Sequence, residues 1–87
     1  MYIASKEEFL KNNPCNPYSL LARMKSDCEY VIGACGCSME SYKYLWALNP
    51  LKQITYMRYL WESLEEKPEW LTMAKINEYA ERLGVCA

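Results

Sequence analysis

Apolar residues recur every three or four positions in three stretches of the chain, which is the spacing of one face of an α-helix. In the first stretch the shared face holds Leu20, Leu21, Met24, Cys28, Val31 and Ile32. In the second it holds Ile54, Met57, Leu60, Trp61 and Leu64. In the third it holds Ile76, Tyr79, Ala80 and Leu83. No stretch of useful length alternates apolar and polar residues, so the pattern predicts helices and no sheet.

Residues that favour helix ends bound these three stretches. Asn16 and Asn49 each precede a proline, which places an N-cap beside a rigid first helical residue. Thr72 is a cap of the same kind for the last helix, and Gly84 is suited to end it. The sequence therefore predicts three long helices over about 17–32, 50–64 and 73–83.

Two shorter helices follow from the same signals. Ser5 and Glu8 have the spacing of a capping box, which predicts a helix over about 6–12. Ser38 follows a small-residue loop and is a cap for a helix over about 39–47. The prediction is an all-α fold, a compact bundle of about five helices, of which three are longer and amphipathic and two are short.

The composition fits one packed domain over residues 1–87. The chain is 52% apolar and 24% charged, which is too apolar for a disordered chain. Eight tyrosines, three tryptophans and one phenylalanine give it a large aromatic content. The helical phase assigns to the core Phe9, Trp46, Trp61, Trp70 and Tyr79. It leaves without a core role Tyr30, Tyr44, Tyr56 and Tyr59.

The chain contains no histidine, which excludes Ser-His-Asp and Cys-His catalysis and a Cys₂His₂ zinc finger. Asp27 is the only aspartate, and no second carboxylate has a spacing that would pair with it for acid–base work. Gly33 and Gly36 lack the strand and the lysine of a phosphate-binding loop. We therefore expect no enzyme, no catalytic residue and no cofactor.

The five cysteines are odd in number and show no CxxC spacing, which favours free thiols in a cytoplasmic protein. Cys28 falls on an apolar helical face and is expected to be a small core residue. The alternative is a zinc-stabilised module in which Cys35 and Cys37 bind the metal together with Cys28 or Cys86. No apolar run approaches the length of a membrane span, so we expect no membrane contact.

Charge is unevenly distributed along the chain. Residues 1–61 carry seven basic and five acidic side chains, whereas residues 62–87 carry three basic and six acidic ones. The acidic flank begins with Glu62, Glu65, Glu66 and Glu69. Such a flank suits docking on a basic partner, and a nucleic-acid site is possible only as a local basic patch in the first two thirds of the chain.

The candidate partner-binding residues are those that the helical phase does not assign to the core. Arg23, Asp27 and Tyr30 share one side of the second helix, either as a partner-binding stripe or as a surface ion pair beside a tyrosine. Lys43 and Tyr44 have the combination that stacks on and neutralises single-stranded nucleic acid. The full predicted set is Arg23, Asp27, Tyr30, Lys43, Tyr44, Tyr59, Glu62 and Glu66.

The order of residues resembles one known family. Two blocks carry most of the resemblance: Asp27-Cys28-x-Tyr30, and Pro68-Glu69-Trp70-Leu71-Thr72. Together with Lys43-x-Leu45-Trp46-Ala47 and Gln53-Ile54-x-x-Met57, they are similar to the large polyvalent protein-associated domain that is eleventh of its series. The resemblance covers about residues 18–83. Tyr44 stands where the family pattern has a histidine, and the loop at 33–38 replaces a more polar one.

The resemblance implies a small protein or domain of phages and conjugative elements of Firmicutes, without a defined biochemical role. Combined with the acidic flank, it favours a non-catalytic counter-defence inhibitor of the anti-CRISPR or anti-restriction type. Its partner would then be a host defence protein or a nuclease complex. The alternatives are an accessory module that binds single-stranded nucleic acid, the zinc-stabilised module, and a small-ligand sponge built from aromatic pockets.

Overall fold

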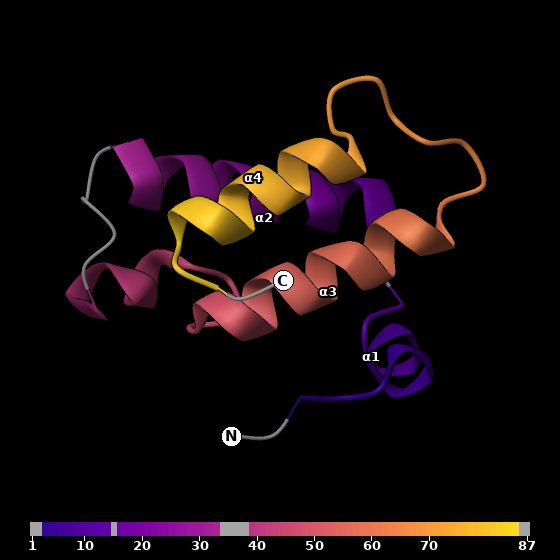
Figure 1. The fold of residues 1–87 in the computed structure, drawn as a ribbon. Helices are drawn as coiled ribbons and strands as arrows, with labels where there is room; N and C mark the ends of the chain where they lie inside the picture. The colour runs from indigo at the N-terminus through magenta and orange to yellow at the C-terminus, as the bar shows by residue number, and fades with distance from the viewer. Residues whose placement is uncertain (1–2, 15, 34–38, 86–87) are drawn as a thin grey trace.

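The computed structural model describes residues 3–14, 16–33 and 39–85, and within them the chain forms helices and no strand (Figure 1). The elements are α1 (Lys6–Asn12), α2 (Pro17–Gly33), the 3₁₀ helix η1 (Met39–Tyr44), α3 (Pro50–Ser63) and α4 (Met73–Arg82). This confirms the all-α class. The described residues contain four α-helices and one 3₁₀ helix, instead of about five α-helices.

Four of the predicted caps are present at the helix starts, and the remaining one, Ser38, lies outside the described residues. The side chains of Ser5, Asn49 and Thr72 each accept a hydrogen bond from the backbone amide three residues on, at 3.3, 3.2 and 3.1 Å. The Asn16 side chain accepts one from the amide two residues on, at 2.9 Å. Gly84 has φ +77°, the left-handed conformation that ends α4 without strain. The local signals therefore predict the ends of α1, α2, α3 and α4 to within one residue.

The helix predicted over about 39–47 is shorter than expected and is a 3₁₀ helix instead of an α-helix. The backbone amides of Trp46 and Ala47 do not continue a helix, because they donate to the side chains of Asp27 and Gln53 at 3.0 Å each. The chain then turns through Leu48, which has φ +61°. Side chains from α2 and α3 thus end η1 at Tyr44 and replace helical hydrogen bonds by long-range ones.

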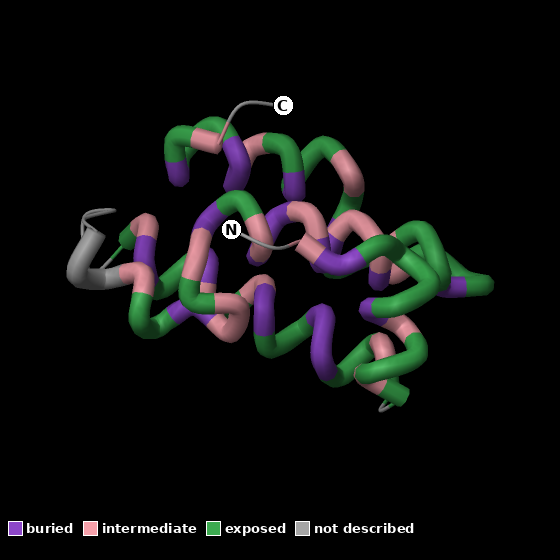
Figure 2. The backbone as a smooth tube through the Cα atoms, turned by 90° about the horizontal axis from the view of Figure 1, so that it is seen from below, coloured by how far each residue is buried: buried purple, intermediate pink, exposed green. Residues whose placement is uncertain are grey.

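The central element is α3, which contacts α1, α2 and α4 (Figure 1). Buried positions alternate with exposed ones along each helix, as expected for amphipathic helices (Figure 2). Most of the predicted apolar faces of the three long helices are buried, and Ile32 and Trp61 are half-buried at their edge. The buried residues include Leu21, Met24, Cys28, Val31, Ile54, Met57, Leu60, Ile76, Tyr79 and Leu83. Phe9 is buried as predicted, and Trp46 and Trp61 are half-buried and pack against the core.

Tyr56 is a correction to the predicted core, since it is buried although its helical phase predicts a position away from the core. Its ring stacks on Phe9 with centroids 4.3 Å apart and an interplanar angle of 12°. Its hydroxyl oxygen accepts a hydrogen bond from the amide of Ala4 at 3.1 Å. The reason is that α1 covers this second side of α3, so α3 has two apolar faces and not one.

Candidate functional site

Two exposed tyrosines meet at the end of α2. The rings of Tyr30 and Tyr44 lie edge to face, with centroids 5.3 Å apart and an angle of 83°. They are 50% and 47% exposed. The Lys43 ammonium lies 5.3 Å from the centre of the Tyr44 ring, within cation–π distance. We call Tyr30, Lys43 and Tyr44 the tyrosine patch; the structure brings these three predicted residues together.

Asp27 lies close to the tyrosine patch but is a structural residue. Its carboxylate is half-buried and accepts the Trp46 amide at 3.0 Å. Burial raises the pKa of Asp27, while the Trp46 hydrogen bond and the positive charge of Arg23 act against this rise. Within the described residues no ion pair joins Arg23 to Asp27, so the expected surface pair is wrong. Arg23 is exposed on α2 and acts on Asp27 only at longer range.

Tyr59 does not join the tyrosine patch. It is half-buried, and its hydroxyl donates to the carbonyl of Ala4 at 3.0 Å. Its ring lies 6.0 Å from Phe9 and 5.9 Å from Tyr56, between centroids. The structure therefore places this predicted partner-binding residue in the packing between α1 and α3.

The predicted acidic residues lie near the other end of α2. Glu62, Glu65, Glu66 and Glu69 are all exposed, and we call them the acidic edge. The Tyr18 hydroxyl donates to the carbonyl of Glu66 at 3.0 Å, which fastens the loop after α3 to the start of α2 (Figure 1). Tyr18 and Tyr30 are 12 residues apart on one helix, so about 18 Å along α2 separates the residue that holds this loop from Tyr30 of the tyrosine patch.

Trp70 is the main difference from the sequence prediction, because it is exposed and not a core anchor. Its side chain is 44% exposed, whereas the next residue, Leu71, is 1% exposed. The Trp61 indole N–H donates to the carbonyl of Leu71 at 3.1 Å and holds the backbone so that Leu71 fills the core position. Trp70 instead borders a shallow hollow of about 280 Å³, which Lys25 and Lys75 also line.

The one lysine within this loop is occupied by the end of α3. The Lys67 ammonium donates to the carbonyls of Trp61, Glu62 and Leu64 at 2.8–3.1 Å. It also lies 4.8 Å from the centre of the Trp61 ring. A cation at the last carbonyls of a helix is favourable. Lys67 is thus committed to capping α3.

Comparison with known proteins places the chain in a family. A family model described as large polyvalent protein-associated domain 11 matches residues 15–83. The chain belongs to this family. No curated protein and no solved structure matches it.

The match to large polyvalent protein-associated domain 11 agrees with the region inferred from the sequence, about 18–83. The two blocks that carried the resemblance lie in and beside α2, since the second lines a hollow together with Lys25 and Glu29. The first block supplies Asp27, Cys28 and Tyr30, and the second supplies the loop that exposes Trp70. The family match begins after α1, so the helix that covers Tyr56 lies outside it.

Cys28 is a core residue, as predicted. It is fully buried, and its thiol lies 3.6 Å from the Met57 sulfur. Burial raises the pKa of Cys28 to about 12, so the thiol stays protonated and is a poor nucleophile. Cys35, Cys37 and Cys86, the other residues of the zinc hypothesis, lie outside the described residues.

The described part of the chain contains neither a cluster of metal-binding side chains nor a helix suited to span a membrane. No three histidine, cysteine or acidic side chains gather there in a way that would bind a metal ion. None of its helices combines the length and apolar character that crossing a membrane requires.

Proposed function

We propose that this chain is a non-catalytic binding protein of a mobile genetic element that inhibits a host defence nuclease by protein–protein contact. The observation that carries the proposal is the exposure of Trp70 within the acidic edge. Tryptophan is the residue type most enriched among interface hot spots, and an exposed one beside a hollow can bury a large apolar area on a partner. The resemblance links the family to phages and conjugative elements, and the family match supports this part of the proposal.

The charge of the acidic edge specifies the kind of partner. Three of its four exposed carboxylates lie in the loop between α3 and α4, and the fourth, Glu62, lies at the end of α3. The lysine of this loop, Lys67, is committed to the end of α3. Proteins that bind nucleic acid carry basic surfaces, so an acidic surface complements them and speeds their encounter. The acidic edge with Trp70 therefore suits docking on the nucleic-acid-binding face of a nuclease.

The experiment is a plasmid-cleavage assay with a Cas9–guide complex and a type I restriction complex, each with the purified chain added. We expect inhibition of at least one complex, and loss of that inhibition in Trp70→Ala and in the double variant E66K/E69K. Tyr44→Ala is the matched control, because it removes an equally exposed aromatic ring at the far end of α2. The proposal would be overturned if the chain inhibited neither complex, or if Trp70→Ala inhibited as strongly as the unaltered chain.

A second candidate function, binding of single-stranded nucleic acid, is favoured by the tyrosine patch. Exposed rings stack on bases regardless of sequence, and Lys43 can neutralise a phosphate. The test is the fluorescence anisotropy of a labelled single-stranded oligonucleotide at increasing salt. This function requires an affinity that falls with salt and that Tyr44→Ala weakens while Trp70→Ala does not. A salt-independent signal excludes it.

A further inference from the structure

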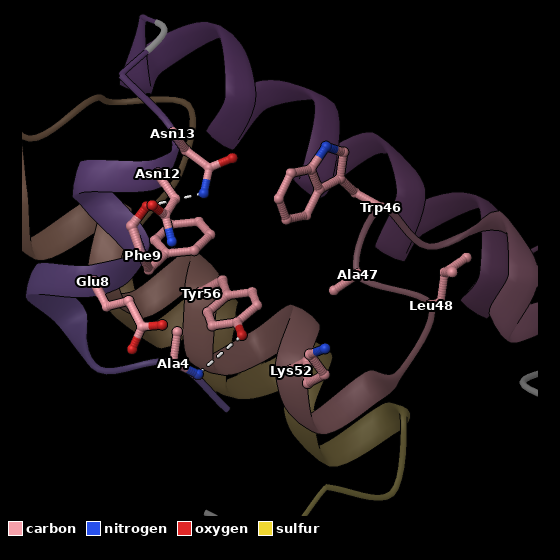
Figure 3. A pocket seen from close by; sticks show the side chains of 10 residues that line it. All are labelled: Ala4, Glu8, Phe9, Asn12, Asn13, Trp46, Ala47, Leu48, Lys52 and Tyr56. Carbon is pink, nitrogen blue, oxygen red and sulfur yellow. Dashed lines mark hydrogen bonds between the residues drawn. The ribbon is translucent and has the colours of Figure 1, made fainter. Parts of the chain in front are cut away.

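A hollow of about 310 Å³ lies between α1, the turn at 46–48 and the first turns of α3 (Figure 3). It is separate from both the acidic edge and the tyrosine patch, since it shares no lining residue with either. Its volume is at the lower limit for small-molecule sites, which is enough for a ligand of about one nucleotide. Aromatic and polar groups both line it.

Three aromatic rings line the hollow. Phe9 and Tyr56 stack on each other, and the Trp46 indole stands nearly perpendicular to both, at 90° and 80° with centroids 6.1 and 6.5 Å away. Phe9 and Tyr56 are buried and make the floor, whereas Trp46 is half-buried. Trp46 stands across the hollow from α1 (Figure 3). A planar ring entering the hollow can therefore stack on the indole or pack against its edge.

The polar groups lie around this aromatic corner. Lys52 lines the hollow from α3, and its ammonium makes no hydrogen bond or ion pair with any described residue. Asn12 lines it from α1 and likewise has no side-chain hydrogen bond within the described chain. Asn13 uses its amide N–H to bond the Phe9 carbonyl at 2.9 Å, which leaves its carbonyl oxygen as an acceptor. Glu8, the one acidic group of the lining, already has an interaction partner within the molecule.

We infer that this hollow binds a nucleoside monophosphate, either free or as the terminal residue of a nucleic-acid strand. The base stacks on Trp46, and the amides of Asn12 and Asn13 offer both donors and acceptors to its edge. The phosphate pairs with the Lys52 ammonium, which has no competing carboxylate bound to it. Glu8 lies on the α1 side and Lys52 on the α3 side, so the anionic end of the ligand is directed toward α3 (Figure 3).

The test is calorimetric titration of the full chain with AMP, GMP, CMP and UMP, with adenosine and inorganic phosphate as partial ligands. At least one nucleotide should bind with a Kd below about 1 mM and more tightly than either partial ligand. Lys52→Gln should weaken binding by about tenfold or more, because it removes a charged hydrogen bond. Lys11→Gln is the matched control, since it removes an exposed lysine of α1 that does not line the hollow.

Two further measurements complete the test. Asn12→Ala, at an exposed position that leaves the fold intact, should weaken the nucleotide and adenosine alike. A single-stranded tetranucleotide with a 5′-phosphate distinguishes the sources: tighter binding than the mononucleotide indicates a strand terminus, and weaker binding indicates a free nucleotide. No nucleotide binding below about 1 mM, or equal loss in Lys52→Gln and Lys11→Gln, would overturn the inference.

Discussion

The carboxylate of Asp27 on α2 accepts the backbone N–H of Trp46, 19 residues later, at 3.0 Å. This bond ends η1 and leaves Tyr44 beside Tyr30. It also fixes the backbone that carries the Trp46 indole, which walls the hollow next to α1. One hydrogen bond therefore supports two of the candidate binding surfaces.

Removing this acceptor should destabilise the fold. Asp27→Ala leaves the Trp46 amide half-buried and unpaired, at a cost of about 1–3 kcal/mol in the free energy of unfolding. Asp27→Asn keeps an oxygen acceptor and should lose less. Urea denaturation at neutral pH measures both, and Ser26→Ala, an exposed neighbour on α2, is the control. Equal losses for the alanine and asparagine variants would show that the hydrogen bond contributes nothing.

Gln53 is the second side chain that holds this turn. It is fully buried, accepts the Ala47 amide at 3.0 Å and donates to the Met24 carbonyl at 3.1 Å. Gln53→Leu keeps the volume but leaves the Ala47 amide unpaired, so it should cost about 1–3 kcal/mol.

Gln53→Glu keeps the acceptor of Gln53 but replaces its amide by a carboxylate. The introduced carboxylate can accept from Ala47 but cannot donate to Met24, and at neutral pH it is a buried charge. It should therefore destabilise more than Gln53→Leu at neutral pH, and the difference should shrink in acid as the carboxylate is protonated. Denaturation at two pH values checks this, and a loss that does not depend on pH would contradict it.

Tyr56 and Tyr59 anchor the segment that leads into α1. The hydroxyl of Tyr56 accepts the Ala4 N–H and the hydroxyl of Tyr59 donates to the Ala4 carbonyl, at 3.1 and 3.0 Å. Each phenylalanine substitution should cost about 0.5–1.5 kcal/mol, and the double variant should free α1 first. Hydrogen exchange read by mass spectrometry should then show faster exchange over 3–12 than over α2. Uniform acceleration along the chain would mean that α1 unfolds only with the rest.

Acid should act on two carboxylates of α2 in opposite directions. Hydrogen bonds from Tyr79, at 2.7 Å, and from Lys25 lower the pKa of Glu29 below 4.5, whereas burial raises the pKa of Asp27 above 3.8. The stabilisation from Glu29 is thus present above pH 4.5 and is lost as pH falls through its folded pKa. The stability linked to the raised pKa of Asp27 is present in full below pH 3.8 and is lost as the pH rises through its folded pKa, while its hydrogen bond from Trp46 persists at neutral pH.

Glu29→Gln should therefore flatten the loss of stability in acid. The difference in unfolding free energy between the unaltered chain and Glu29→Gln should shrink as the pH falls below 4.5. Tyr79→Phe removes the donor, so it should raise the pKa of Glu29, which carboxyl NMR titration measures directly. An unchanged Glu29 pKa in Tyr79→Phe would assign the shift to Lys25 instead.

The sequence predicted the helices well because their signals are local. Caps such as Asn49 and Thr72 act within one turn, and the apolar faces follow from 3.6-residue periodicity. The errors concern residues whose environment is made by distant segments. Tyr56 is buried by α1, and η1 ends early because Asp27 and Gln53 take the amides that an α-helix needs.

The candidate site was less predictable for the same reason. Tyr30 and Lys43-Tyr44 were singled out separately, but no local rule indicates that they meet. Trp70 was assigned to the core on its apolar character, and only the bond from Trp61 to Leu71 explains why the smaller residue is buried instead. The hollow at Phe9, Trp46 and Tyr56 could not be foreseen, since its walls combine α1 with the turn at 46–48 and α3, which are distant from α1 in sequence.

The helix α1 lies outside the family match but covers the side of α3 that carries the hollow. The family match starts at residue 15, yet Phe9 of α1 covers Tyr56 and walls the hollow. A chain trimmed to residues 15–83 would keep its four-element frame but expose Tyr56 and Tyr59 to water, and would self-associate through that patch. Relatives that share only the matched region need a different cover for this side of α3. The hollow therefore depends on residues that lie outside the matched region.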